Sequence, residues 1–275
     1  MKTKASLPFF GFFRTTPENV SRDTIAIIGS KCVSRSIHPL FGQHKSTEVL
    51  RKLSYELCTH NLQARTSLEN YDIVDLGDFK PSEITTVVVE TLKRGARILV
   101  IGGDHTTTYY ALRNIDIPHL TIFDAHLDLE ECSEKFHHGC VARKLLEENK
   151  KLSINFVGLR GYSTLKDEIE FAELLKQRII PWPVSRETMR FFISRSKFIS
   201  IDLDFLSPKS FPAVRVPEAL GPDVDSFLAL ISSIESTSAI YVDVVEYAPE
   251  IDPGYSNGKV LLQLVLEILA LLARS

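Results

Sequence analysis

The sequence contains little cysteine, and its spacing does not suggest a metal cluster or dense cross-linking. The 275 residues include four cysteines, Cys32, Cys58, Cys132 and Cys140, and no CxxC pair. This spacing argues against a zinc cluster and against a disulfide framework. We therefore expect a reduced compartment and a cytoplasmic protein.

Long apolar runs and basic stripes are also missing. The most apolar stretch, VLLQLVLEILALLA, contains Gln263 and Glu267, so it suits a packed helix better than a membrane span. The opening MKTKASLPFFGFFR resembles a signal peptide in its short apolar run, but Pro8, Gly11 and Arg14 interrupt it, and we interpret it as an aromatic arm. A net charge of −3 without a Lys/Arg stripe argues against nucleic acid as a partner. A small molecule is the expected partner.

Apolar segments of strand length alternate with segments of helical periodicity along the whole chain. The eight predicted strands lie at 24–31, 71–78, 97–103, 119–126, 154–160, 178–182, 197–205 and 238–247. The helices between and after them are predicted at 46–62, 81–95, 106–115, 138–150, 163–177, 185–195, 222–235 and 258–274. Connections that hold a helix imply parallel pairing, and strands buried on both faces lack polar alternation. The pattern predicts one α/β domain over residues 1–275, and it leaves an open sheet and a barrel as alternatives.

The stretch TIFDAHLD carries the clearest chemical signal. Asp124, His126 and Asp128 occupy alternate positions where an apolar strand ends, so their side chains point to the same side. Two carboxylates and an imidazole that converge in this way can bind a metal. Taken alone, the stretch could equally be a strand end with solvated polar residues.

Polar residues follow three other strands at the same kind of place, the carboxyl end. They are Asp104 and His105, then Asp202 and Asp204, then Asp243 and Glu246. Singly, His105 is better explained as a helix-capping histidine and the aspartate pair as a strand-end turn. Together they indicate a site, because ligand sites of open parallel sheets lie at the carboxyl ends of the strands.

The charges of these residues suggest which ligand they bind. The candidate metal ligands are His105, Asp124, His126, Asp128, Asp202 and Asp204. Four carboxylates in one pocket repel one another unless cations neutralise them, and two divalent metals would do so. Oxygen and nitrogen donors without thiolate fit manganese better than a structural zinc. Paired metals of this kind lower the pKa of a shared water, so the predicted chemistry is hydrolysis.

The motifs GGDHTTT, FDAHLD and SIDLDFLSP, in this order, resemble the signatures of the ureohydrolase family, which includes arginase, agmatinase, guanidinobutyrase and formimidoylglutamase. The resemblance implies a three-layer α/β/α fold with a largely parallel sheet of about eight strands. It further implies two Mn²⁺ per chain, hydrolysis of a guanidino or amidino group, and a homotrimer or homohexamer.

The resemblance also implies residue roles. The first metal would be held by His105, Asp124, Asp128 and Asp202, and the second by Asp124, His126, Asp202 and Asp204. Asp128 would also pass a proton to the leaving amine, Glu246 would pair with the substrate guanidinium, and His138 in HHGC would shuttle protons or position the substrate. Asp104 would support the ligand loop.

The sequence departs from the family pattern after the third motif, with Ser207 for an aspartate and Ala213 and Arg215 for glycines. Agmatinases are the most similar members, so the expected reaction converts agmatine to putrescine and urea. The alternatives are arginase, guanidinobutyrase or formimidoylglutamase activity, or a non-catalytic homologue. The acidic residues Glu130, Glu131 and Glu134 favour the cationic tail of agmatine, whereas Arg215, if it faces the pocket, favours an acidic tail.

Overall fold

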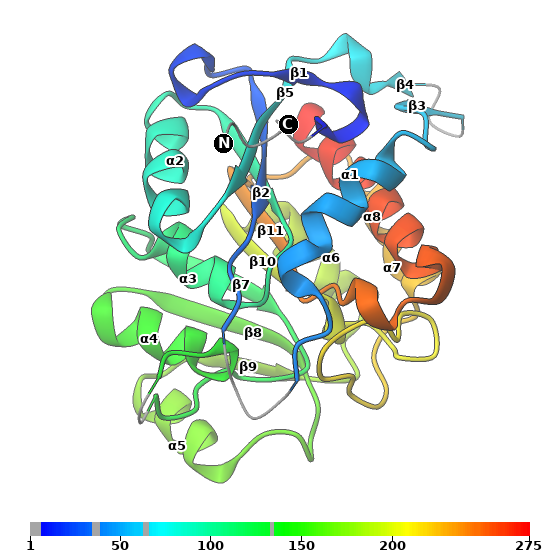
Figure 1. Cartoon of the computed structure of the whole chain (residues 1–275). Helices are drawn as coiled ribbons and strands as arrows, with labels where there is room; N and C mark the ends of the chain where they lie inside the picture. The colour runs from blue at the N-terminus through cyan, green and yellow to red at the C-terminus, as the bar shows by residue number, and fades with distance from the viewer. Residues whose placement is uncertain (1–6, 35–38, 63–65, 133–134) are drawn as a thin grey trace.

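A computed structural model describes residues 7–34, 39–62, 66–132 and 135–275. Its centre is a nine-stranded sheet in which every neighbouring pair is parallel (Figure 1). The strands, in spatial order, are β1 (Phe13–Arg14), β5 (Ile73–Phe79), β2 (Ile25–Ser30), β6 (Arg97–Ile101), β11 (Tyr241–Val245), β10 (Phe198–Asp202), β7 (His119–Phe123), β8 (Ser153–Leu159) and β9 (Arg178–Pro181). A separate antiparallel pair is formed by β3 (His60–Asn61) and β4 (Thr66–Ser67).

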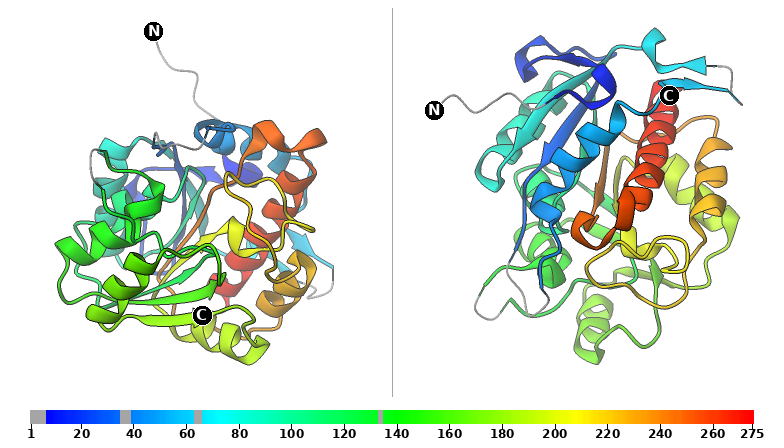
Figure 2. Two further views of the ribbon diagram at one scale, coloured as in Figure 1. Left: turned by 90° about the horizontal axis from the view of Figure 1, so that it is seen from below. Right: turned by 45° about the vertical axis from the view of Figure 1, so that its right-hand side comes forward.

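Helices cover both faces of the sheet (Figures 1 and 2). One core lies between the sheet and α1 (Ser46–Ser54), α6 (Arg186–Arg195), α7 (Val224–Ser232) and α8 (Ser256–Ala273). The other lies between the sheet and α2 (Pro81–Lys93), α3 (Thr106–Leu112), α4 (Val141–Glu148) and α5 (Lys166–Leu174). Short 3₁₀ segments are η1 (Phe9–Gly11), η2 (Pro17–Asn19), η3 (Gln43–Lys45), η4 (Leu68–Asn70), η5 (His138–Cys140), η6 (Leu203–Phe205), η7 (Pro249–Ile251) and η8 (Pro253–Tyr255). The predicted three-layer α/β/α fold is confirmed, and the sheet is open.

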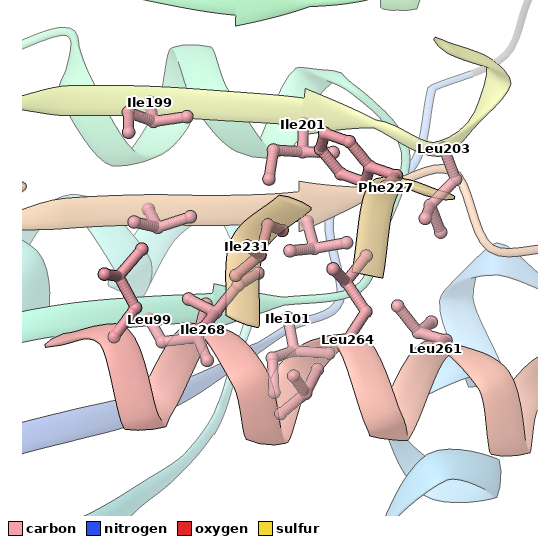
Figure 3. Close-up of a cluster of buried hydrophobic side chains, with 14 of the residues drawn as sticks. Leu99, Ile101, Ile199, Ile201, Leu203, Phe227, Ile231, Leu261, Leu264 and Ile268 are labelled. Carbon is pink, nitrogen blue, oxygen red and sulfur yellow. The ribbon is translucent and has the colours of Figure 1, made fainter. Parts of the chain in front are cut away.

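Alternation within the strands divides the two cores. Ile25 and Ile27 of β2 pack on the side of α8, whereas Ala26 and Ile28 pack on the side of α2. Both faces are buried, which is why the strands read as continuous apolar runs. Figure 3 shows the core on the α8 side, where Ile268 of that helix lies against strand residues such as Leu99.

Several boundaries differ from the sequence prediction by a few residues, and two differences are larger. The ninth strand, β1, comes from the predicted aromatic arm, where Phe13 pairs with Val74 of β5. The helix predicted over 46–62 ends at Ser54, whose hydroxyl donates to the carbonyl of Arg51 at 2.8 Å and accepts the amide of Phe10 at 2.9 Å. A serine that bonds nearby backbone in this way competes with the helix.

By length and composition alone, the segment Pro253–Ala273 is long and apolar enough to cross a membrane. In the fold, most of its side chains are buried in the core on the α8 side. The interpretation of this stretch as a packed helix agrees with that placement.

A buried ion-pair network fixes the N-terminal arm to the sheet. Arg51 of α1 contacts Asp75, and its Nη2 lies 2.7 Å from Oδ1 of Asp78, with all three side chains almost fully buried. The Arg51 guanidinium also lies 4.1 Å from the centre of the Phe9 ring. Asp75 in turn accepts the Phe9 amide at 2.6 Å. The arm and β5 therefore share one set of buried charges.

Replacing Arg51 by methionine should destabilise the fold by about 3 kcal/mol, because Asp75 and Asp78 lose their buried counterion and keep only the more exposed Arg14 and Lys31, at 3.4 and 3.8 Å. Urea unfolding measures the change. The matched control is Lys52→Met, which removes an exposed pair with Glu48 and should change little. Equal unfolding midpoints for the two variants would contradict a stabilising role for the network.

Candidate metal centre

Four neighbouring strands deliver the predicted site residues to one edge of the sheet. The spatial order β6, β11, β10, β7 places four carboxyl ends side by side. The residues that follow or end these strands are Asp104 and His105 after β6, Glu246 after β11, Asp202 and Asp204 at β10 and η6, and Asp124, His126 and Asp128 after β7. The chain thus reaches this edge from segments more than a hundred residues apart.

One group of side chains surrounds the ring of His105. Its Nδ1 lies 2.8 Å from Oδ2 of Asp128, 3.2 Å from Oδ2 of Asp124 and 3.4 Å from Oδ2 of Asp202. All four residues are buried. Nδ1 of His105 and Oδ2 of Asp124 nevertheless make no hydrogen bond. Buried donors and acceptors are rarely left unpaired, so atoms that face a common point in this way fit a cation between them.

A second group adjoins the first and shares Asp124 with it. Nδ1 of His126 lies 2.8 Å from Oδ2 of Asp204 and 3.5 Å from Oδ1 of Asp124. One ligand atom from each of His105, Asp124 and Asp202 fits within 4.8 Å, and the same holds for Asp124, His126 and Asp204. The structure therefore brings the six predicted ligand side chains together around two adjacent positions. Their oxygen and nitrogen donors suit divalent cations that accept carboxylate and imidazole.

The protonation equilibria reflect crowded negative charge. Burial, followed by the charge of Asp124, raises the pKa of Asp128 to about 7. Burial and then Asp204 raise the pKa of Asp202 well above its ordinary value. Burial alone would lower the pKa of His105, but the close carboxylates of Asp124 and Asp128 raise that pKa well above the usual range. The cluster therefore retains protons that a bound cation would displace.

On the opposite edge of the His105 ring, a buried chain of hydrogen bonds, which we call the relay, runs through Ser200, Asp243 and Tyr241. Nε2 of His105 lies 3.1 Å from Oγ of Ser200, which donates to Oδ1 of Asp243 at 2.6 Å. Tyr241 donates to the other oxygen of Asp243 at 2.7 Å. This arrangement directs Nδ1 toward the carboxylates. Sequence reasoning noted Asp243 and missed Ser200, although Ser200 precedes Asp202 by two residues and so shares its side of β10.

Ser200→Ala and Asp243→Asn should each weaken Mn²⁺ binding by roughly 10–100-fold, because partners behind a ligand histidine fix its ring orientation. Titration of metal-free protein with Mn²⁺ measures this effect. The control is Ser196→Ala, which removes a hydroxyl pair with Thr121 away from the carboxyl ends of the strands. Unchanged affinity in both test variants would contradict the relay.

Glu246 presents an unpaired carboxylate oxygen next to the ligand groups. Its Oε1 accepts the amide of His105 at 2.9 Å, while its buried Oε2 has no hydrogen-bond partner among the residues that the structure describes. The backbone φ of Glu246 is 71°, a left-handed conformation that non-glycine residues rarely adopt and that clusters at functional sites. Nδ1 of His138 lies 3.6 Å from Oε1 of Glu246. His137, its neighbour, instead points toward Glu130, with 4.0 Å between Nε2 and Oε2.

The structure assigns a direction to Arg215. Its Nη1 lies 3.6 Å from Oδ2 of Asp104, and both side chains are essentially inaccessible. The same Asp104 oxygen accepts the amide and the hydroxyl of Ser34 at 2.5 and 2.6 Å. Arg215 therefore lies in the inner wall with its charge next to a carboxylate. The neighbouring Ala213 carbonyl accepts the amide of Ala248, two residues after Glu246, at 2.9 Å.

The loop after Asp128 contains a disulfide, which the cysteine spacing argued against. Cys132 and Cys140 are bonded, with Cα atoms 5.9 Å apart. The two cysteines are eight positions apart in the sequence, so they form no short motif, and the folding of the loop brings the two sulfurs together. Cys32 and Cys58 are free.

Comparisons with known proteins agree with the fold and the motif order. The family model described as Arginase family matches residues 23–270. An uncharacterised 32.2 kDa protein of Methanothermus fervidus is 30% identical over 238 residues, which cover 78% of this chain and 81% of that protein. The N(1)-aminopropylagmatine ureohydrolase of Thermococcus kodakarensis is 28% identical over 193 residues, which cover 63% of this chain and 65% of that enzyme.

Among solved structures, the proclavaminate amidino hydrolase from Streptomyces clavuligerus superposes with a TM-score of 0.81 at 21% identity. The superposition covers 98% of this chain and 97% of that chain. At this identity the likeness establishes the shared fold.

Proposed function

This chain belongs to the arginase family, and on that premise we propose that it hydrolyses agmatine to putrescine and urea with two Mn²⁺ per chain. Family membership makes it a hydrolase of linear amidines. The observation that carries the proposal is the unpaired Oε2 of Glu246, buried next to the two ligand groups. A planar amidinium cation has paired N–H donors that match such a carboxylate.

The proposed ligands follow the two groups of side chains. His105, Asp124, Asp128 and Asp202 would hold the first Mn²⁺, and Asp124, His126, Asp202 and Asp204 the second, with Asp124 and Asp202 shared. When bound, the cations supply Lewis acidity and a water of lowered pKa. Thiolate is absent from both groups, which supports manganese over a structural zinc.

Three residues of this chain would carry the remaining steps. Glu246 orients the guanidinium carbon by pairing with its N–H groups. Asp128 is placed to orient the attacking water and to deliver a proton to the leaving amine, because its Oδ2 lies 2.8 Å from Nδ1 of His105 at the first group. His138, 3.6 Å from Glu246, positions the substrate or relays a proton.

The charges around the substrate tail favour agmatine, which ends in an ammonium group. Arg215 is buried against Asp104, so its positive charge is offset within the wall. Glu218 is partly exposed, with Oε1 3.6 Å from Nε2 of His126, and a hydrogen bond with this histidine lowers the pKa of Glu218 to about 2. Glu130 lies in the loop after Asp128, next to His137. Glu134 is outside the described residues. Ionised carboxylates at the rim attract a cationic tail.

The alternatives within the family are arginine, guanidinobutyrate and formiminoglutamate. Hydrolysis of these compounds and of agmatine should be compared with Mn²⁺ added, using urea or the released amine as the product. We expect the highest kcat/KM for agmatine and a loss of roughly 10²-fold or more in Glu246→Gln, which keeps the side-chain size. Preference for guanidinobutyrate would overturn the substrate assignment. No turnover of any compound by manganese-loaded protein would overturn the function.

We also propose a homotrimer or homohexamer located in the cytoplasm, as the family resemblance suggests. Sedimentation equilibrium of the manganese-loaded protein measures the oligomer size. A monomer at micromolar concentration would contradict this assembly.

A further inference from the structure

The Cys132–Cys140 disulfide lies between two parts of the proposed active site. Asp128 is four residues before Cys132, and His138 is two residues before Cys140. The disulfide therefore closes a ring that begins just after a proposed metal ligand and ends at the loop that carries the histidine facing Glu246. Breaking or forming this covalent bond therefore affects both Asp128 and the loop that carries His138.

Besides the disulfide, hydrogen bonds restrain the described residues of the ring at its two ends. The amide of Glu130 donates to the carbonyl of Gly139 at 3.0 Å, which closes the loop next to the disulfide. The amide of His138 donates to Oγ of Ser34 at 3.1 Å. The carbonyl of Asp128 accepts the amides of Ala142 and Arg143 at 3.1 and 3.3 Å, and this pairing sets the start of α4. These hydrogen bonds lie at the two ends of the ring, and the disulfide adds a covalent link between the segments that carry Asp128 and His138.

The two cysteine residues differ in burial, which favours one direction of exchange. Cys132 is partly exposed, whereas Cys140 is fully buried. An attacking thiolate can reach only a sulfur that solvent can reach. Cys132 is therefore the entry point, and Cys140 is the leaving group.

We propose that Cys132 and Cys140 form a reversible thiol–disulfide exchange site that controls hydrolysis by holding or releasing the His138 loop. A thiolate of a dithiol reductant attacks Sγ of Cys132, the S–S bond breaks, and its electron pair leaves on Sγ of Cys140, which takes a proton from solvent. The second thiolate of the reductant then attacks the mixed disulfide and forms the reductant's own S–S bond. Cys132 leaves as a thiolate and takes a proton from solvent. Two protein thiols and one small disulfide are the products, and a disulfide oxidant reverses the reaction.

The oxidised form is the active one. With the bond intact, Nδ1 of His138 lies 3.6 Å from Glu246, and the turn after Asp128 is fixed. Reduction lets the loop move, so His138 and Asp128 lose their geometry. Misplacement of about 1 Å in a catalytic group costs up to roughly 10²-fold, and we expect a fall in kcat/KM of about tenfold. The effect on turnover rests on the proposed function, whereas the exchange itself does not.

The first measurement needs no substrate. Protein equilibrated with oxidised glutathione and then unfolded should show at most two alkylatable thiols, Cys32 and Cys58, because the exposed Cys58 can also form a mixed disulfide with glutathione, and four after dithiothreitol. Hydrogen exchange at the amides of 129–143 should rise on reduction, while α8 stays unchanged. Four thiols before reduction, or identical exchange in the two states, would overturn the proposal.

The second measurement follows agmatine hydrolysis in saturating Mn²⁺. Oxidised parent should lose about tenfold in kcat/KM with dithiothreitol and regain it with oxidised glutathione. Cys132→Ser should stay at the reduced level in both conditions, which also controls for metal removal by the dithiol. Cys58→Ser, which removes the exposed free thiol, should respond like the parent.

The outcomes separate the two proposals. Equal rates in oxidised and reduced parent would overturn the control of hydrolysis. The expected thiol count and the expected rise in hydrogen exchange could occur with no hydrolysis in either state. That result would overturn the proposed function and leave the thiol–disulfide exchange site supported.

Discussion

Chelation is expected to abolish hydrolysis and to lower the midpoint of thermal unfolding, and added Mn²⁺ is expected to restore both. The physical reason is the density of negative charge. The carboxylates of Asp124, Asp128, Asp202 and Asp204 are buried within two overlapping groups. Without cations these charges repel in a medium of low dielectric constant, which destabilises the native state.

The size of the effect follows from binding linkage. A cation at a hundredfold excess over its Kd stabilises by about 2.7 kcal/mol per site, or roughly 5–10 °C for a chain of this size. Unfolding should be followed by calorimetry before and after dialysis against EDTA, with metal content measured on the same samples. Calcium at the same concentration is the matched control, since it prefers all-oxygen sites. Full activity in metal-free protein would end the dinuclear proposal.

The stabilisation by metal should grow with pH between about 4 and 7. Burial, and then Asp124, raises the folded-state pKa of Asp128 to about 7. A carboxyl whose pKa is raised stabilises the native state below its unfolded value of about 4, and this contribution is lost as pH rises through about 7. The metal-free protein therefore loses stability across this range, while cation binding strengthens as ligands deprotonate. A gap between the two unfolding midpoints that shrinks with pH would contradict this account.

The strands could be predicted because most of them are buried on both faces. Residues such as Ile27 and Ile28 point to opposite cores, so the run is apolar without alternation. The edge strand β1 could not be predicted in this way. It has two residues, one of them exposed, and it exists because Phe13 and Arg14 pair with β5. Edge pairing depends on tertiary contacts that local sequence does not encode.

The convergence of the site could be predicted, but its walls could not. Carboxyl ends of parallel strands meet at one edge, so Asp124 and Asp202 were expected to be neighbours before the strand order was known. The direction of Arg215 depends on a loop that folds back against Asp104, and the bond between Cys132 and Cys140 depends on the path of another loop. Loops carry no periodicity from which such contacts can be read.

Asp128 and the shared aspartates should separate into two classes when each is replaced by asparagine. Asp128→Asn is expected to lower kcat by roughly 10²–10⁴-fold, because the amide can neither accept nor deliver a proton at the reacting centre. It should keep much of its metal, since the other first-group residues, His105, Asp124 and Asp202, remain.

Asp124 and Asp202 should behave differently from Asp128, because each is proposed to contribute to both groups of ligands. Asp124 approaches His105 at 3.2 Å through Oδ2 and His126 at 3.5 Å through Oδ1, so one carboxylate serves both groups. Asp124→Asn, and likewise Asp202→Asn, should therefore lose metal occupancy as well as turnover. Metal content by elemental analysis, set against kcat on the same preparation, distinguishes the classes. Wild-type turnover in Asp128→Asn would contradict its role in proton transfer. Full metal content in Asp124→Asn would contradict its bridging role. A carboxylate that joins two cations cannot be replaced by an amide without loss of negative charge at both cations.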